Sequence, residues 1–473
     1  MAMKRTLLLS LLTGLFASAQ TPCNGGMAGI YPCNNMDLMA RVDFPQMGGT
    51  FNTEGSSCWG WTDPLDGKEY AIMGCSTHTA FVDITNPATP VYKGKVNSTN
   101  NVSSWWREMK VYNNYCFIVS EATGHGMQIF DLTRLRNVTF PQVFAPDALY
   151  TGFGNCHTIS INEQTGFAYC FGSNTFGGGV HVVNIQNPES PSLAMGYPQQ
   201  DYTHDGQVVN YIGPDTQHLG KEIFVGANEN KVIIVDVTNK SNPVLLSTFT
   251  YPNTSYTHQG WFTTDHKYWI LGDEIDELDF GFNSRTLVID MTDLDAPTLK
   301  MQYIGPTEAI DHNGYTKPGE FYLANYTAGL RLIDTDGIAN NVMQEIGFFD
   351  TYPQDDSASF QGAWSNYPYF PSGSVIISDI DRGLFIVRKG DALSVGENAA
   401  QKFVMSPNPA GESVTLSGSS VPMELVEIFD MPGKRVKSYA PASTEATLDI
   451  RGLSPGVYLV RINGSDSKKL IVR

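Results

Sequence analysis

Four of the nine histidines recur at intervals of 47, 54 and 54 residues: His157, His204, His258 and His312. Neutral imidazole is a common ligand of zinc, copper and iron, so these rings could hold a transition-metal ion if the fold gathers them. They could equally be structural, because repeat proteins often reuse one polar residue per repeat to bond neighbouring strands. No short-range motif such as HExxH decides between the two interpretations.

Charged residues near these histidines are candidates for accessory roles. Asp205 and Asp311 each adjoin one of the four histidines, and nearby carboxylates commonly orient metal-bound imidazoles. Arg107 and Glu108 open an earlier segment, where they could orient a ligand or pair with each other. Because the chain has no GxSxG, P-loop or CxxC motif, no complete catalytic constellation can be named, and the question of enzymatic activity stays open.

An acidic run contains Asp273, Glu274, Asp276, Glu277 and Asp279. Hard oxygen ligands at this density suit calcium, although their spacing does not follow the EF-hand loop. Charge runs usually lie in solvent, so we expect a solvated acidic loop and keep a calcium loop as the alternative.

These residues belong to an internal repeat of about fifty residues. Seven units open at Trp59, Trp106, His157, His204, His258, His312 and Trp364. Within each unit a third apolar strand follows, and in six units it ends in Asp or Asn, whose side chain can bond the next turn. These residues are Asp83, Asp131, Asn184, Asp236, Asp290 and Asp334. Four short strands per unit predict one propeller blade, hence an all-β, seven-bladed β-propeller over residues 20–390.

Propeller geometry predicts where the unit openings lie. Each opening starts an innermost strand, so all seven should ring the central channel at one face. The turns between second and third strands share that face, which would add His78, His125 and the acidic run. The seventh unit lacks an outer strand, and the segment MDLMARVDF (36–44) is expected to supply it and close the ring.

Tryptophans gather near the same openings. They are Trp59, Trp61, Trp105, Trp106, Trp261 and Trp364. Core packing explains most of them, and stacking against a sugar or another flat ligand is the alternative.

The first 19 residues predict a signal peptide, with Lys4 and Arg5, a short apolar run and Ala17-Ser18-Ala19 as the cleavage site. This run is too short to span a membrane, which needs about 20 apolar residues, and no other run could, so we expect an exported protein without a transmembrane segment. The net charge of −18 argues against nucleic acid or anionic membranes as partners.

Seven cysteines in an exported chain suggest disulfides. Cys23 and Cys33 are close enough to staple the mature N-terminus. Cys58/Cys75 and Cys156/Cys170 each flank one predicted hairpin, so each pair could form a disulfide bond. Cys116 would then have no partner. The sequence leaves this pairing open.

The repeat region resembles the LVIVD-repeat proteins, in particular the group named choice-of-anchor B. The resemblance rests on segments such as WGWTDPLDGKEYAIMG (59–74), THQGWFTTDHKYWILGDEIDE (257–277) and ANYTAGLRLID (324–334). It implies a propeller and export, and it carries no activity.

The end of the chain has short alternating strands with Pro-Gly turns, which predict a small Ig-like β-sandwich. MSPNPAGESV (405–414), LSPGVYLVRI (453–462) and KKLIVR (468–473) resemble a type IX (Por) secretion sorting domain. We assign it to residues 402–473, after a polar linker at 391–401. The resemblance implies that the type IX machinery carries the chain across the outer membrane, after which the domain is removed and the protein is released or attached to the cell surface.

Three functions are compatible with this sequence. The favoured one is a secreted or cell-surface binding or scaffold propeller, in which the histidines at the channel mouth either are structural or hold a metal ion such as zinc, copper or iron. The alternatives are a metal-dependent hydrolase or oxidase that uses the histidine cluster, and a carbohydrate-binding surface protein. An enzyme would need at least three histidine nitrogens near one point with an open coordination position.

Overall fold

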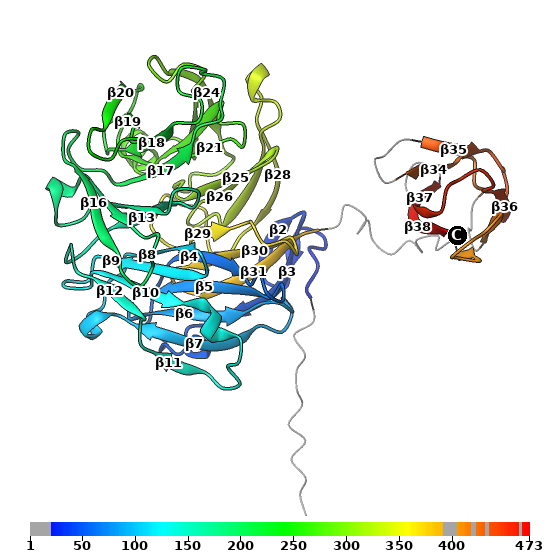
Figure 1. Ribbon diagram of the computed structural model, residues 1–473, viewed down its shortest axis with the longest axis horizontal. Coiled ribbons are helices and arrows are strands. Elements are labelled where there is room, and N and C mark those ends of the chain that lie inside the picture. Colours follow the sequence, from blue (N-terminus) through cyan, green and yellow to red (C-terminus); the bar gives the residue numbers. More distant parts are fainter. Residues whose placement is uncertain (1–19, 391–403, 418–421, 431–434, 463–465) are drawn as a thin grey trace, which may run out of the picture. The chain divides into compact units, whose positions relative to one another are not determined.

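The computed structural model describes residues 20–390, 404–417, 422–430, 435–462 and 466–473. Contacts divide the chain into two compact units, Met1–Asp391 and Ala392–Arg473 (Figure 1). The predicted signal peptide and linker lie outside the described residues. Among the described helices, none is both long enough and apolar enough to cross a membrane.

The described part of the first unit contains seven β-sheets, most of them built from four consecutive antiparallel strands. The first four sheets contain β4 (Gly55–Thr62), β5 (Glu69–Cys75), β6 (His78–Asp83), β7 (Val91–Asn97) and β11 (Gln142–Phe144); β8 (Arg107–Tyr112), β9 (Tyr115–Ser120), β10 (Met127–Asp131) and β12 (Ala148–Tyr150); β13 (Thr158–Asn162), β14 (Phe167–Phe171), β15 (Val180–Asn184) and β16 (Ser192–Tyr197); and β17 (Asp205–Asn210), β18 (Glu222–Ala227), β19 (Val232–Asp236) and β20 (Val244–Phe249).

Two of the other three sheets include strands from the N-terminal segment. They contain β21 (Thr257–Phe262), β22 (Tyr268–Asp273), β23 (Arg285–Asp290) and β24 (Thr298–Ile304); β25 (Gly314–Lys317), β26 (Glu320–Ala324), β27 (Leu330–Asp334), β28 (Gln344–Phe349), β2 (Tyr31–Asn34) and β1 (Met27–Ala28); and β29 (Ala363–Tyr367), β30 (Ser374–Asp379), β31 (Gly383–Lys389) and β3 (Met36–Val42). The described helices are short: α1 (Asp276–Phe280) and the 3₁₀ helices η1 (Pro45–Met47), η2 (Thr99–Asn101), η3 (Leu132–Leu135), η4 (Phe176–Gly178) and η5 (Ile338–Asn340).

The first strands of the seven sheets contact one another in a closed circuit, β4–β8–β13–β17–β21–β25–β29–β4. The sheets follow one another around this circuit, so the all-β first unit is propeller-like (Figure 1). The predicted closing strand is confirmed, because β3 pairs antiparallel with β31. This pairing covers an edge of β31 that would otherwise expose unpaired backbone groups.

Polar side chains bond the turns after the third strands, as the repeat predicts. In six sheets the terminal Asp or Asn accepts a hydrogen bond from the backbone N–H two residues later, at 2.8–3.1 Å. Between the sheets lie apolar side chains such as Ile234, Leu271 and Ile289, all essentially inaccessible to solvent. Full burial of such a side chain contributes about 1.5–3 kcal/mol.

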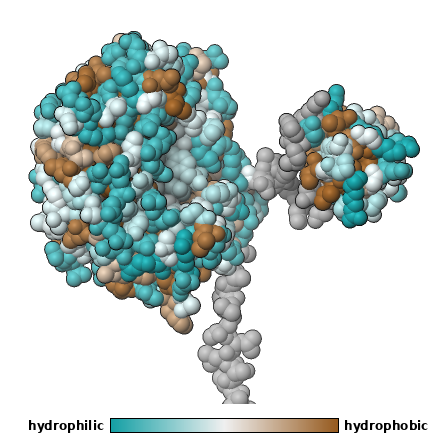
Figure 2. Space-filling view, viewed as in Figure 1, coloured by the Kyte–Doolittle hydropathy of each residue, from teal (hydrophilic) through white to brown (hydrophobic). Residues whose placement is uncertain are grey.

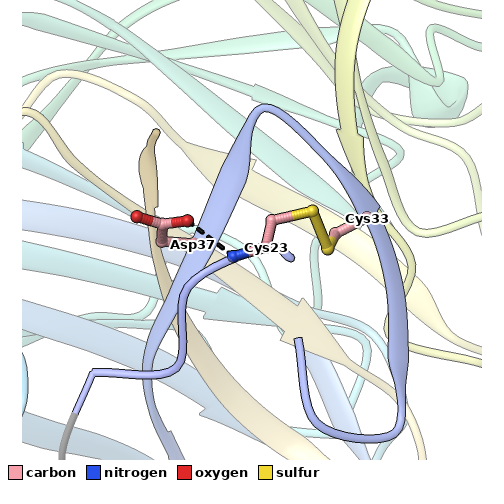
Figure 3. The surroundings of a disulfide bond; sticks show 3 residues. All are labelled: Cys23, Cys33 and Asp37. Atoms are coloured by element: carbon pink, nitrogen blue, oxygen red, sulfur yellow. Dashed lines mark hydrogen bonds between the residues drawn. A yellow bond between two sulfur atoms is a disulfide. The ribbon is translucent and has the colours of Figure 1, made fainter. Parts of the chain in front are cut away.

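The N-terminal staple is confirmed, since Cys23 and Cys33 form a disulfide bond. The backbone N–H of Cys23 also donates to the Asp37 carboxylate at 2.8 Å (Figure 3). Through Cys33, which pairs with Phe349 of β28, and Asp37, which lies in β3, the staple joins two neighbouring sheets.

The other described cysteines are buried free thiols, so neither of the two further candidate pairs is bridged. The register of β4 and β5 explains why Cys58 and Cys75 are not bridged, because Cys75 lies opposite Gly55 whereas Cys58 lies opposite Met73. Cys156 precedes β13, and its thiol donates to the carbonyl oxygen of Phe171 at 3.1 Å.

The second unit contains two described sheets that share one apolar cluster, which includes Val414, Leu416, Ile428, Val460 and Leu470. One sheet is formed by β32 (Val404–Ser406), β33 (Ser413–Ser417) and β36 (Ala446–Asp449), and the other by β35 (Arg435–Tyr439), β34 (Val426–Asp430), β37 (Gly456–Ile462) and β38 (Asp466–Val472).

Candidate metal centre

The four repeated histidines lie at the starts of neighbouring inner strands and line one cavity of about 420 Å³. His157 and His204 directly precede β13 and β17, His258 is the second residue of β21, and His312 lies just before β25. The repeat therefore places them at one opening of the ring, as the sequence predicts. On the face of the first unit seen in Figure 2, hydrophobic residues form separate patches on a mostly hydrophilic surface.

The imidazoles form a row and do not converge on a single point. Consecutive ring centroids are 4.3 Å apart for His157 and His204, and 4.4 Å apart for each of the next two pairs. Only the end of this row meets a carboxylate from the acidic run. The Nε2 atoms of His258 and His312 lie 3.6 and 3.4 Å from the two carboxylate oxygens of Glu274.

His258, Glu274 and His312 thus offer three ligand atoms that all lie within 4.8 Å of one another. The Nδ1 atom of His312 is bonded to the backbone oxygen of Trp364. A ring nitrogen that donates to a backbone oxygen fixes the tautomer and leaves the other nitrogen with a lone pair for a metal. The buried Nδ1 of His258 has no hydrogen-bond partner among the described residues.

The other two rings are held differently. His204 uses Nδ1 to reach the backbone oxygen of His258 at 3.2 Å. His157 is bonded through Nδ1 to the Glu121 carboxylate at 2.6 Å. The row therefore has a carboxylate near each end, Glu121 beside His157 and Glu274 beside His312.

Burial controls the charge of this site. It lowers the pKa of His312 to about 3 and places the pKa values of His204 and His258 well below the usual range. These rings are neutral at physiological pH, which is the form that binds metals. Burial also raises the pKa of Glu274 to about 7. The Tyr326 hydroxyl, which donates a hydrogen bond to Glu274 at 2.8 Å, lowers this pKa but by less than burial raises it.

Aromatic side chains surround the histidine row. Trp106, Trp364 and Tyr326 line the cavity, and Trp105 and Phe360 stand at its edge, 55% and 48% exposed. The charged residues of the lining are all acidic: Glu54, Glu274 and Asp381. We call these aromatic side chains the aromatic cup; the charged residues of the same lining are acidic.

Of the two roles open to Arg107 and Glu108, the structure does not show the pairing with each other. Neighbouring residues of a strand point to opposite faces, and Arg107 donates to the backbone oxygen of Cys75 at 3.0 Å and bonds His125 at 3.0 Å. Glu108 instead forms an ion pair with Lys110. Arg107, Glu108 and Asp205 line a second, narrow cavity together with the four histidines. Burial, followed by the charge of Glu108, raises the pKa of Asp205 to about 7.

The expectation of a solvated acidic loop is also wrong, because Asp273, Asp276 and Glu277 are at most 3% exposed. Asp276 accepts from Arg285 Nε at 2.5 Å, and Glu277 accepts from the Arg285 backbone N–H at 3.0 Å. A buried guanidinium, which the sequence pattern did not reveal, compensates these carboxylates.

Asp311 is fully buried near this cluster, and burial, followed by the charges of Glu277 and Asp276, raises its pKa well above the usual value. Its described hydrogen bond comes from the Thr286 hydroxyl, at 3.3 Å, and does not involve the ring of His312. Calcium binding by the acidic loop stays a prediction.

His78 and His125, which were expected at this face, are fully buried and are absent from the lining of the cavity. His78 is bonded through Nε2 to the backbone oxygen of Met47 at 3.1 Å, and His125 contacts Arg107. Burial lowers the pKa of each to about 4, so both are neutral structural residues.

The tryptophans divide between two openings. Trp105, Trp106 and Trp364 line the histidine cavity, whereas Trp59, Trp61 and Trp261 line a different one. Trp59 was expected to open the first repeat unit, but β4 begins at Gly55, which takes that position in the histidine cavity. A bulge between Gly55 and Cys58 accounts for part of this offset.

Sequence reasoning missed Glu121, Tyr326 and Phe360. Glu121 and Tyr326 both lie in turns between the second and third strands of their sheets. The propeller rule places such turns at this face, so a survey of their polar residues would have found both. Phe360 lies in the long connection before β29, where the repeat carries no signal.

Comparisons with known proteins agree with this architecture. Residues 80–98 and 219–250 match the LVIVD repeat, and residues 405–473 match the secretion system C-terminal sorting domain. No curated protein matches the chain.

Among solved structures, the hydrazine synthase of Kuenenia stuttgartiensis is 11% identical, with a TM-score of 0.50 over 74% of this chain and 97% of that one. PorZ, a surface component of the type IX secretion system of Porphyromonas gingivalis, is 12% identical, with a TM-score of 0.45 over 86% of this chain. The match spans 58% of the length of PorZ. The Cps50 β-propeller domain of Myceliophteria thermophila is 9% identical, with a TM-score of 0.43 over 68% of this chain and 93% of that one.

At 11% identity the likeness to hydrazine synthase bears on the fold alone, whereas the family matches bear on the chain itself. The protein carries LVIVD repeats in a propeller-like, all-β body and ends in a secretion system C-terminal sorting domain, which indicates export by the type IX system to the cell surface or the extracellular space.

Proposed function

We propose that the exported protein is a seven-bladed β-propeller that acts as a binding or scaffold protein and holds a transition-metal ion at one opening of its channel. The seven sheets and the closed circuit of their first strands support the blade count. The two small sheets around one core support an Ig-like sandwich for the sorting domain.

The ligands of the ion are Nε2 of His258, Nε2 of His312 and the carboxylate of Glu274. Two imidazoles and one carboxylate are a ligand set used for zinc and for non-haem iron. The observation that carries this assignment is the position of Glu274, with one oxygen facing each Nε2 at 3.4–3.6 Å. A cation there would also compensate a carboxylate that is only 13% exposed.

His204 is the next ring in the row and is the candidate fourth ligand, while Glu121 already engages His157. Three protein ligands beside an open cavity are also the arrangement of catalytic zinc sites. Glu274 takes the place of the third histidine that we expected an enzyme to need, so a metal-dependent hydrolase or oxidase stays the second candidate. In either case the aromatic cup determines which ligands reach the ion.

Metal content of the mature protein tests the proposal, measured by elemental mass spectrometry after reconstitution with zinc, copper or iron(II) and dialysis. We expect about one equivalent of one metal, lost in the His258→Ala/His312→Ala variant and bound at least tenfold more weakly by Glu274→Gln. His266→Ala, which changes a histidine at a different opening, should retain the metal. Absence of metal from the parent, or equal metal in the folded variants, would contradict the proposal.

A further inference from the structure

The ring has a second opening, formed where the first strands of the sheets end. This opening contains a cavity of about 800 Å³, within the usual range for ligand pockets. Every sheet of the first unit contributes to it through residues in or just after its first strand: Trp59, Val111, Glu163, Gln207, Trp261, Thr316 and Tyr367. The histidine cavity lies at the opposite ends of these strands, so the two sites are separate.

Half-buried aromatic rings form one part of the lining. Trp59 packs edge-on against Tyr367, with ring centroids 4.9 Å apart. Trp261 packs edge-on against the buried Tyr315, with ring centroids 5.0 Å apart. Tyr369 continues the belt at 5.3 Å from Tyr367. Edge-to-face packing fixes the orientation of these rings before any ligand arrives.

Uncharged hydrogen-bonding groups form the other part. They are the side chains of Thr62, Asn113, Asn114, Gln207, Thr263, Thr264 and Thr316. Gln207 accepts from the Phe262 backbone N–H at 2.7 Å through Oε1, so its Nε2 group is left to donate to a ligand. Such groups recognise hydroxyls that both donate and accept.

The charge of the lining restricts the ligand further. The described lining contains no Lys or Arg, one carboxylate, from Glu163, and one histidine, His266, whose pKa is lowered to about 4 by burial. Lys110, whose Nζ lies 4.2 Å from the ring centroid of Trp59, is already paired with Glu108. An anionic ligand would therefore lose its hydration without gaining an unpaired basic partner. A neutral ligand with many hydroxyls has no such cost.

We infer that this second opening binds a neutral oligosaccharide. A sugar ring presents apolar C–H faces that pack on the aromatic belt, and hydroxyls at its edge that bond the amide and hydroxyl side chains. Export to the cell surface or beyond brings this opening into contact with extracellular polysaccharides. The inference does not depend on the metal site, which lies at the other opening.

The test is binding of the full mature protein to an array of neutral oligosaccharides with glucose, mannose, galactose, xylose and N-acetylglucosamine backbones. Hits are quantified by titration calorimetry. Trp261→Ala should weaken binding at least tenfold, and Thr264→Trp, which places a bulky ring at an exposed position of the lining, should block it without touching the core. The control is Trp105→Ala at the histidine opening, which should bind like the parent.

An array without neutral hits would overturn the inference, as would binding to anionic glycans alone. Binding that both lining variants leave unchanged would also overturn it. The His258→Ala/His312→Ala variant should keep full sugar affinity, so a failure of the metal proposal and a failure of the sugar site are separately visible.

Discussion

Removing the Cys23–Cys33 disulfide should destabilise the propeller measurably. The bond closes a loop with a sequence separation of 10, and loop-closure entropy for that length corresponds to about 2.7 kcal/mol at 25 °C. The loop is not peripheral, because Cys33 is 1% exposed and pairs with β28, while the Cys23 backbone bonds Asp37 of the ring-closing strand β3. Loss of the staple therefore frees a segment that joins two neighbouring sheets.

The perturbation is the double variant Cys23→Ala/Cys33→Ala, and the assay is urea unfolding of the mature chain followed by tryptophan fluorescence. We expect a lower midpoint with an unchanged slope, because the surface exposed on unfolding is similar. Dithiothreitol should reproduce this loss in the parent. It should have no further effect on the variant, since the other described cysteines are free thiols.

Two results would refute this reasoning. A destabilisation below about 1 kcal/mol would mean that the loop is ordered equally well without its crosslink. A further loss when the variant is reduced would mean that Cys58, Cys75, Cys156 or Cys170 is bridged in solution, contrary to the structure.

Two further substitutions test the packing and the charges. Asp63 accepts two hydrogen bonds from Arg136, at 2.7 and 2.8 Å, which lower its pKa below the unfolded value. Its contribution is complete above the unfolded pKa and is lost as the pH falls through the folded pKa. Asp63→Asn should therefore lower the urea midpoint more at pH 6 than at pH 3. Gly60→Ala would place a Cβ atom 2.1 Å from the Tyr367 ring, so it should cost about 1–3 kcal/mol in thermal or urea unfolding. Gly390→Ala is the control, because its Cβ atom would lie 3.5 Å from the nearest neighbouring atom, which is an ordinary contact, and it should cost much less.

The sequence by itself determined the repeat, its strands and the opening at which the histidines lie. The reason is periodicity. His157, His204, His258 and His312 take equivalent places in successive units, so any fold that stacks those units brings them to the same opening. The Asx turns were predictable because each depends on one side chain and a backbone N–H two residues away.

Only the tertiary structure decided how these side chains meet. That the imidazoles form a row, and that Glu274 is the carboxylate facing His258 and His312, depends on contacts between sheets that no local pattern encodes. The burial of the acidic loop follows in the same way from Arg285, which lies in the next strand. Spacing along the chain selects the face on which a residue lies, whereas packing across the ring selects its partner.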